Sequence, residues 1–117
     1  MEDNLLLFGK CPVTTTQKII SGKWAIIIFY HLRTGTKRFG ELQRLIPGIT
    51  QTMLTKQLRS LEDYGLINRV VYPEVPPKVE YSLTEIGEKF MPVLDALEKW
   101  GNEYIKISAS SCIKEQK

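Results

Sequence analysis

Residues 49–78 read ITQTMLTKQLRSLEDYGLINRVVYPEVPPK, and their pattern changes halfway from helical to extended. In the first half, apolar side chains recur at three- and four-residue spacings, which predicts an amphipathic helix from Thr50 to Tyr64. Thr50 suits the N-cap of this helix, and Gly65 suits its C-terminal stop. The side chains expected to face the core are Met53, Leu54, Leu58 and Leu61.

The second half predicts two strands joined by a rigid tip. Residues 66–72 and 78–83 are rich in Ile, Val and Tyr, and Pro76 and Pro77 lie between them. Branched and aromatic side chains favour strands, and the proline pair favours a turn. An all-helical alternative would need residues 67–83 to be helical, and their Val, Tyr and Pro content disfavours it.

Glycine, proline and capping residues also mark the expected ends of helices in the flanking sequence. A first helix is expected from Thr14 to about Ser21, because Thr14 and Gln17 fit a capping box. Two more helices are expected at residues 23–32 and 39–46, with a very short strand at Lys37–Arg38 between them. A long last helix follows Thr84 as its cap, and Pro92 predicts a kink within it.

This order of elements predicts a mainly α fold with a small β-hairpin wing. It is the order of a winged helix-turn-helix with extra helices at the N- and C-termini that form a dimer. We expect residues 1–10 to form an N-terminal arm and residues 109–117 a flexible tail. Residues 11–108 form one winged helix-turn-helix domain that ends in a dimerisation helix.

The composition is that of a globular domain, with 43% apolar and 25% charged residues. The longest apolar run, Trp24–Tyr30, is far shorter than the roughly 20 residues of a membrane span. The first residues lack the basic start of a signal peptide. We therefore expect a cytoplasmic protein without a membrane partner.

The basic charge is concentrated in the middle of the chain. Residues 33–78 hold eight basic and four acidic side chains, a net charge of +4. Residues 79–117 hold five basic and seven acidic side chains, a net charge of −2. This asymmetry makes the middle segment the candidate surface for a polyanion such as double-stranded DNA.

The fourth predicted helix has the side chains that base reading requires. Helix-turn-helix proteins lay the start of their second helix in the major groove. Gln can pair with adenine, Lys or Arg with guanine, and a Thr methyl can touch the thymine methyl. The candidate DNA-binding residues on this helix are Thr50, Gln51, Thr52, Thr55, Lys56 and Arg59. Lys37, Arg38 and Lys78 are candidates for phosphate contacts.

Several short motifs are spread over about residues 11–104. They are Cys11-Pro12-Val13, Gly22-Lys23-Trp24, residues 38–42, residues 46–49, Leu54-Thr55, residues 58–62, residues 75–81 and residues 83–87. Together these motifs resemble the HxlR-type winged-helix regulators. The resemblance implies a bacterial transcription regulator that acts as a homodimer on paired half-sites, with the fourth helix and the wing on DNA.

A dimer is also favoured by the last helix itself. It has more large apolar side chains than we expect the small core to cover, and the alternative is that all of them pack within one subunit. We expect the dimer interface to include Leu94, Leu97, Trp100 and Tyr104, together with residues 5–8. Repression is the favoured direction of regulation, because a small bound dimer blocks polymerase without further contacts.

Cys11 is a candidate redox sensor. The resemblance implies this role, since several such regulators sense oxidants or electrophiles at the cysteine of the Cys-Pro-Val motif. Lys10 and the helix after Cys11 would favour a thiolate. The alternative is an idle thiol. Cys112 lies outside the motif, and the two cysteines are expected to be free.

Other function classes are weaker. The single histidine, His31, has no partners at metal-ligand spacing, and neither a nucleophile motif nor a phosphate loop is present. We therefore expect no enzyme, no metal and no cofactor. The remaining alternative is a winged-helix module that contacts proteins and not DNA. The operator, the regulated genes and any effector do not follow from the sequence.

Overall fold

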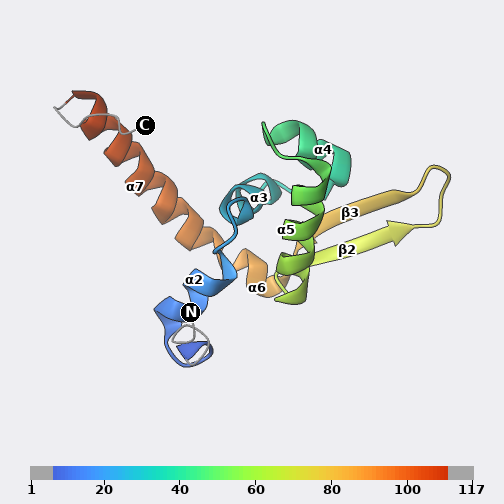
Figure 1. The fold of residues 1–117 in the computed structure, drawn as a ribbon, viewed down its shortest axis with the longest axis horizontal. Helices are drawn as coiled ribbons and strands as arrows, with labels where there is room; N and C mark the ends of the chain where they lie inside the picture. The colour runs from blue at the N-terminus through green and yellow to red at the C-terminus, as the bar shows by residue number, and fades with distance from the viewer. Residues whose placement is uncertain (1–6, 111–117) are drawn as a thin grey trace.

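The computed structural model describes residues 7–110. Helices α3, α4 and α5 gather at the base of the hairpin β2–β3, while the hairpin and α7 project in opposite directions (Figure 1). The mainly α fold with a small hairpin wing is confirmed. In chain order the elements are α2 (Pro12–Ile19), α3 (Ala25–Leu32), β1 (Lys37–Arg38), α4 (Phe39–Leu45), α5 (Gln51–Asp63), β2 (Ile67–Tyr72), β3 (Lys78–Leu83), α6 (Glu85–Glu88) and α7 (Met91–Ser110).

The sheet is antiparallel, with strand order β1-β3-β2. Ile67 pairs with Leu83 and Tyr72 with Lys78, so the hairpin keeps one register along its whole length. The two-residue strand predicted at Lys37–Arg38 exists and pairs with the middle of β3. The short strand therefore ties the start of α4 to the base of the wing.

The core lies where α3, α4 and α5 meet the sheet. Phe29 is completely buried, and its ring centroid lies 4.6 Å from that of Phe90, the residue just before α7. Burial of an aromatic or branched side chain contributes about 1.5–3 kcal/mol to stability. The fully buried side chains are Phe29, Ile28, Leu42, Ile46, Leu54, Leu58 and Leu61.

Helix α5 begins and ends as predicted, but one of its core residues differs. The Thr50 hydroxyl accepts a hydrogen bond from the Met53 amide at 3.1 Å, the geometry of an N-cap. Met53 is 42% exposed, so its predicted place in the core is wrong. Gln57 is buried in its stead, because it continues the row of Leu54, Leu58 and Leu61.

The N-cap of helix α2 lies three residues earlier than the predicted N-cap, Thr14. Cys11 is its N-cap and Pro12 occupies the first turn, where a missing amide hydrogen costs nothing. Thr14 therefore lies inside the first turn, and the predicted capping box is wrong. The Thr14 hydroxyl donates instead to the Cys11 Sγ at 3.3 Å.

The predicted last helix is two helices. Thr84 caps the first of them, since its hydroxyl accepts a hydrogen bond from the Gly87 amide at 3.1 Å. A break then separates α6 from α7, and Pro92 is the second residue of α7. Proline is tolerated in a first turn, so the chain ends one helix and starts another, and no kink forms within a helix.

Some expectations fall outside the described residues. These are the arm before Leu7, including its share of the expected dimer interface, the tail beyond Ser110, and Cys112. Within residues 7–110, no helix is long and apolar enough to cross a membrane.

Candidate nucleic-acid interface

The outward face of α5 presents hydrogen-bonding groups without internal partners. Gln51, Thr52, Lys56 and Arg59 are exposed and Thr55 is half-buried, and together they line one shallow hollow. Within the described residues, the side chains of Gln51, Lys56 and Arg59 make no hydrogen bond or ion pair. Their donors are therefore available to a ligand. The Thr50 hydroxyl, in contrast, is engaged as the helix cap.

A second, polar hollow of about 210 Å³ lies between α5 and the sheet. Arg59 and Glu62 reach it from α5, and Arg69 reaches it from β2, where it pairs with Tyr81. Glu62 belongs to the last turn of α5, and it shares this hollow with two arginines. Only the packing of α5 on the hairpin reveals that juxtaposition.

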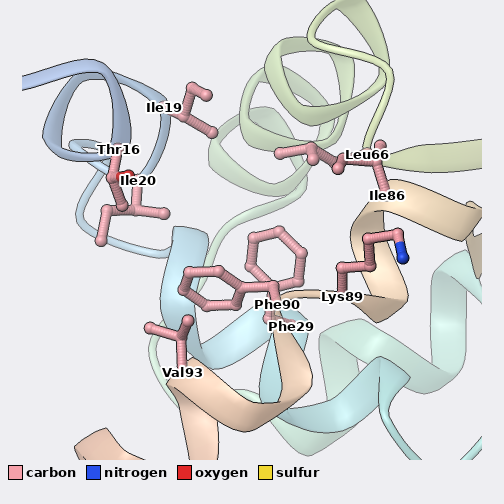
Figure 2. Close-up of a pocket in the computed structure, with 9 residues that line it drawn as sticks. All are labelled: Thr16, Ile19, Ile20, Phe29, Leu66, Ile86, Lys89, Phe90 and Val93. Carbon is pink, nitrogen blue, oxygen red and sulfur yellow. The ribbon is translucent and has the colours of Figure 1, made fainter. Parts of the chain in front are cut away.

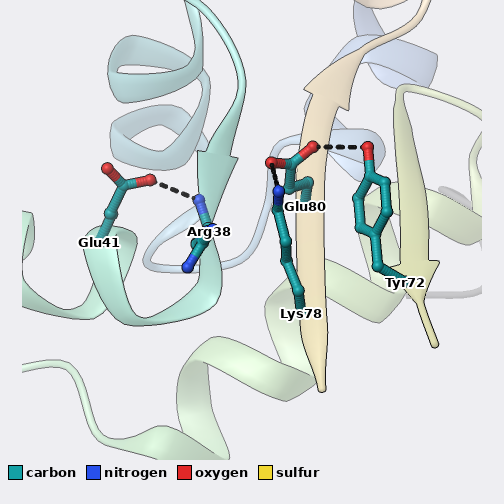
Figure 3. Close-up of polar contacts among 5 residues, drawn as sticks. All are labelled: Arg38, Glu41, Tyr72, Lys78 and Glu80. Atoms are coloured by element: carbon teal, nitrogen blue, oxygen red, sulfur yellow. Dashed lines mark hydrogen bonds and ion pairs between the residues drawn. The ribbon is translucent and has the colours of Figure 1, made fainter. Parts of the chain in front are cut away.

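The residues before α4 have different environments. The Lys37 Nζ donates to the Thr34 Oγ1 at 3.0 Å and to the Gly35 carbonyl at 3.4 Å, so it lies over the turn after α3. The Arg38 amide donates to the Glu41 Oε1 at 2.7 Å, which fixes the start of α4 (Figure 3). The Arg38 side chain is exposed. Arg38 is thus the freer of the two predicted phosphate contacts.

Lys78 on the wing is engaged by its own hairpin. Its Nζ lies 3.5 Å from the Glu80 Oε2 and 4.6 Å from the centre of the Tyr72 ring (Figure 3). The Tyr72 hydroxyl donates to the Glu80 Oε1 at 3.0 Å, and this bond raises the pKa of Tyr72. Glu80 therefore offsets the charge of Lys78. A phosphate at the wing would have to compete with that carboxylate.

Helix α7 exposes an apolar stripe. Trp100 is 68% exposed and stacks on Tyr104, with ring centroids 5.6 Å apart, and Leu97 is 40% exposed. Leu94 does not lie with them. It is 3% exposed and buried in the core of its own chain, so its predicted place in a dimer interface is wrong. The stripe of Leu97, Trp100 and Tyr104 is free within the described chain.

Cys11 is a partly buried thiol at the start of α2. The hydrogen bond from the Thr14 hydroxyl lowers the pKa of the Cys11 thiol, and the amides of the first turn act in the same direction. A lowered pKa increases the fraction of reactive thiolate. In residues 7–110 no cluster of three or more His, Cys, Asp or Glu could hold a metal ion.

The match to a known family rests on most of the chain. Residues 19–109 match the model described as HxlR-like helix-turn-helix. The chain belongs to this HxlR-like family. YdeP of Bacillus subtilis, an HTH-type transcriptional regulator, is 57% identical over 97 residues, which are 83% of this chain and 76% of YdeP.

Solved structures agree with the family match. The redox regulator HypR in its reduced form has a TM-score of 0.80 and 48% identity, covering 86% of this chain and 100% of that one. The reduced form of the regulator YodB from B. subtilis has a TM-score of 0.70 and 35% identity, covering 80% of this chain and 93% of that one. YdeP and YodB are transcriptional regulators, and the family that this chain matches is one of regulators and not of enzymes.

Proposed function

We propose that this chain, a helix-turn-helix transcriptional regulator, represses its genes as a sequence-specific homodimer on paired half-sites. Helix α5 enters the major groove, and the wing lies along the backbone. The observation that supports this proposal is the unpaired polar face of α5, where Gln51, Lys56 and Arg59 have free donors. Gln51 and Arg59 read base edges, whereas Arg38 contacts phosphate.

The experiment is footprinting on the region upstream of the protein's own gene, followed by affinity measurements over a salt series. We expect protection of two half-sites and a steep loss of affinity as salt rises, because each contacted phosphate adds nearly one unit to the log–log slope. A module that contacts only proteins would give weak binding to any duplex with little salt dependence, and that result would overturn the proposal.

Two variants separate base reading from phosphate contact. Gln51→Ala should cost about 1–3 kcal/mol on the preferred site and relax the preference at one base position. Arg38→Ala should weaken binding to all duplexes alike and reduce the salt slope by about one unit. If Gln51, Lys56 and Arg59 can each be replaced by Ala without changing the footprint, α5 is not the reading helix. Gln17→Ala, an exposed glutamine on α2, is the matched control.

Cys11 supports an additional, thiol-dependent level of control. Its pKa is lowered by Thr14, and HypR, 48% identical to this chain, is a redox regulator. The test compares DNA affinity of the parent protein and Cys11→Ser, each with and without the thiol oxidant diamide. Oxidation should change the affinity of the parent protein alone. Equal affinity in all four samples would remove Cys11 from the regulation and leave the DNA proposal intact.

A further inference from the structure

An apolar hollow of about 190 Å³ shares no lining residue with the polar face of α5. Helices α2, α3, α6 and α7 and the turn after α5 all contribute to it (Figure 2). Its floor is the buried Phe29, and its rim includes Ile86 and Val93, which are about half exposed. The lining residues are Thr16, Ile19, Ile20, Phe29, Leu66, Ile86, Lys89, Phe90 and Val93.

The size of the hollow selects small ligands. An apolar cavity of about 150 Å³ in another protein takes up benzene, so this hollow has room for one six-membered ring. The Phe90 ring lies in the centre of the lining, between the α2 side chains and Leu66 (Figure 2). A ligand ring can therefore pack against an aromatic face as well as against isoleucines.

The charge at the rim selects anions. Among residues 7–110, Lys89 is the one charged residue in the lining, and none of the Asp or Glu side chains of these residues lines the hollow. The Lys89 amine makes no ion pair with any described residue. The Thr16 hydroxyl donates to the Pro12 carbonyl at 2.9 Å, so its proton is already used. A ligand with a polar group here meets a positive donor at one edge and apolar side chains elsewhere.

We infer that this hollow binds a small apolar carboxylic acid with a single ring. The ring fills the space between Ile20, Phe90 and Leu66, and the carboxylate reaches the Lys89 Nζ at the rim. A charge-assisted hydrogen bond of this kind is stronger than a neutral one. A ligand with a protonated amine would instead be repelled by the positive charge of Lys89. A neutral ring compound would gain only the apolar contacts.

Benzoate is the probe, titrated into the full chain with 13C-labelled isoleucine methyl groups and followed by NMR. Saturable shifts are expected at Ile19, Ile20 and Ile86, with no shift at Ile105, an exposed residue of α7 outside the hollow. Benzyl alcohol, which has the same ring and no charge, should shift the same methyl groups with at least fivefold weaker affinity. The assay contains no DNA, so its result is independent of the proposed function.

Two variants test the roles assigned to the lining. Lys89→Met should weaken benzoate at least fivefold and leave benzyl alcohol within twofold. Lys99→Met changes an exposed lysine of α7 outside the hollow, and it should alter neither affinity. Val93→Phe should weaken both ligands, because the larger ring occupies the mouth of the hollow. Circular dichroism and thermal unfolding verify that each variant is folded.

Three results would overturn the inference. They are the absence of saturable shifts up to roughly 10 mM benzoate, equal effects of Lys89→Met and Lys99→Met, and unchanged binding in Val93→Phe. If a second copy of the chain covers the hollow in solution, benzoate finds no site, and the first of these results is obtained.

Discussion

Cys11 shows how a neighbouring hydroxyl tunes a single thiol. The Thr14 hydroxyl donates a hydrogen bond to the Cys11 sulfur, and this bond stabilises the thiolate more than the thiol. The sequence suggested that Lys10 and the helix start would favour the thiolate, whereas the largest influence on the pKa of Cys11 is Thr14.

Thr14→Val should therefore raise the pKa of Cys11 and slow its alkylation by iodoacetamide at pH 7 roughly two- to fivefold. The rate measured against pH gives the direction of the pKa change directly. Thr16→Val is the matched control, because the Thr16 hydroxyl donates to the Pro12 carbonyl and not to sulfur. Equal alkylation rates in Thr14→Val and the parent protein would contradict the assignment.

His31 makes stability depend on pH. Partial burial of the imidazole lowers its pKa below the ordinary value, and the charges of Lys37 and Arg33 lower it further. The unfolded chain then binds a proton at a higher pH than the folded chain does. The stabilisation is complete above the unfolded pKa of about 6.5 and is lost as pH falls below it.

Urea unfolding between pH 8 and pH 5 checks this expectation. The free energy of unfolding should decrease below about pH 6.5 in the parent protein and decrease less in His31→Gln. If the two proteins keep a constant difference in stability over this range, His31 has no part in the pH dependence.

At the scale of elements, Thr84 joins three segments. Its hydroxyl donates to the Gly65 carbonyl at 2.7 Å and accepts from the Gly87 amide at 3.1 Å, while its own amide donates to the Leu66 carbonyl at 3.0 Å. The turn after α5, the end of β3 and the start of α6 are therefore fastened at one residue.

Thr84→Ala should lower the free energy of unfolding by about 1–2 kcal/mol, because an N-cap and a second hydrogen bond are both lost. Thr84→Ser keeps the hydroxyl and should stay within about 0.5 kcal/mol of the parent protein. Denaturant unfolding measures both. Equal losses in the two variants would show that the methyl group, and not the hydroxyl, provides the stabilisation.

The sequence predicted the elements well where the local signals were strong. Thr50 and Gly65 predicted the two ends of α5, the proline tip predicted the hairpin, and Thr84 predicted the start of α6. It failed where two local rules competed. Pro12 set the start of α2 ahead of the Thr14 capping box, and Pro92 allowed a new helix to begin where a kink was expected.

The sequence predicted which face of α5 carries the candidate site, but not which other side chains contact its residues. The spacing along α5 identified Gln51, Lys56 and Arg59, because exposure on a helix follows its period. The contact of Lys78 with Glu80 is a pair at positions i and i+2 of β3, which the alternation of a strand places on one face. That Glu62 and Arg69 share a hollow depends instead on how the hairpin packs against α5. No periodicity along a single segment contains that information.

At the scale of the whole molecule, α7 is the element with the most uncovered apolar surface. Leu97, Trp100 and Tyr104 recur at three- and four-residue spacings on one side of it. A pair of such stripes from two chains would bury the stacked rings together, the arrangement expected of a symmetric dimer.

Trp100→Asp should shift the protein from dimer to monomer in sedimentation equilibrium, because a buried carboxylate without a partner opposes association. Asn102→Asp adds the same charge to an exposed position of α7 outside the stripe, and it should leave the dimer intact. A dimer of unchanged stability in Trp100→Asp would mean that the chains associate elsewhere.

The close approach of α6 to the turn after α5 limits how such a regulator can respond to a signal. A Cβ at Gly87 would overlap the Leu66 carbonyl, a backbone atom that cannot move aside. We therefore expect the end of α5, the base of the wing and the start of α7 to move together as one rigid piece. In a pair of chains joined through α7, we expect an effector to abolish operator recognition without unfolding either chain. It must change the distance or tilt between the two rigid pieces, so that both can no longer meet successive turns of the same duplex.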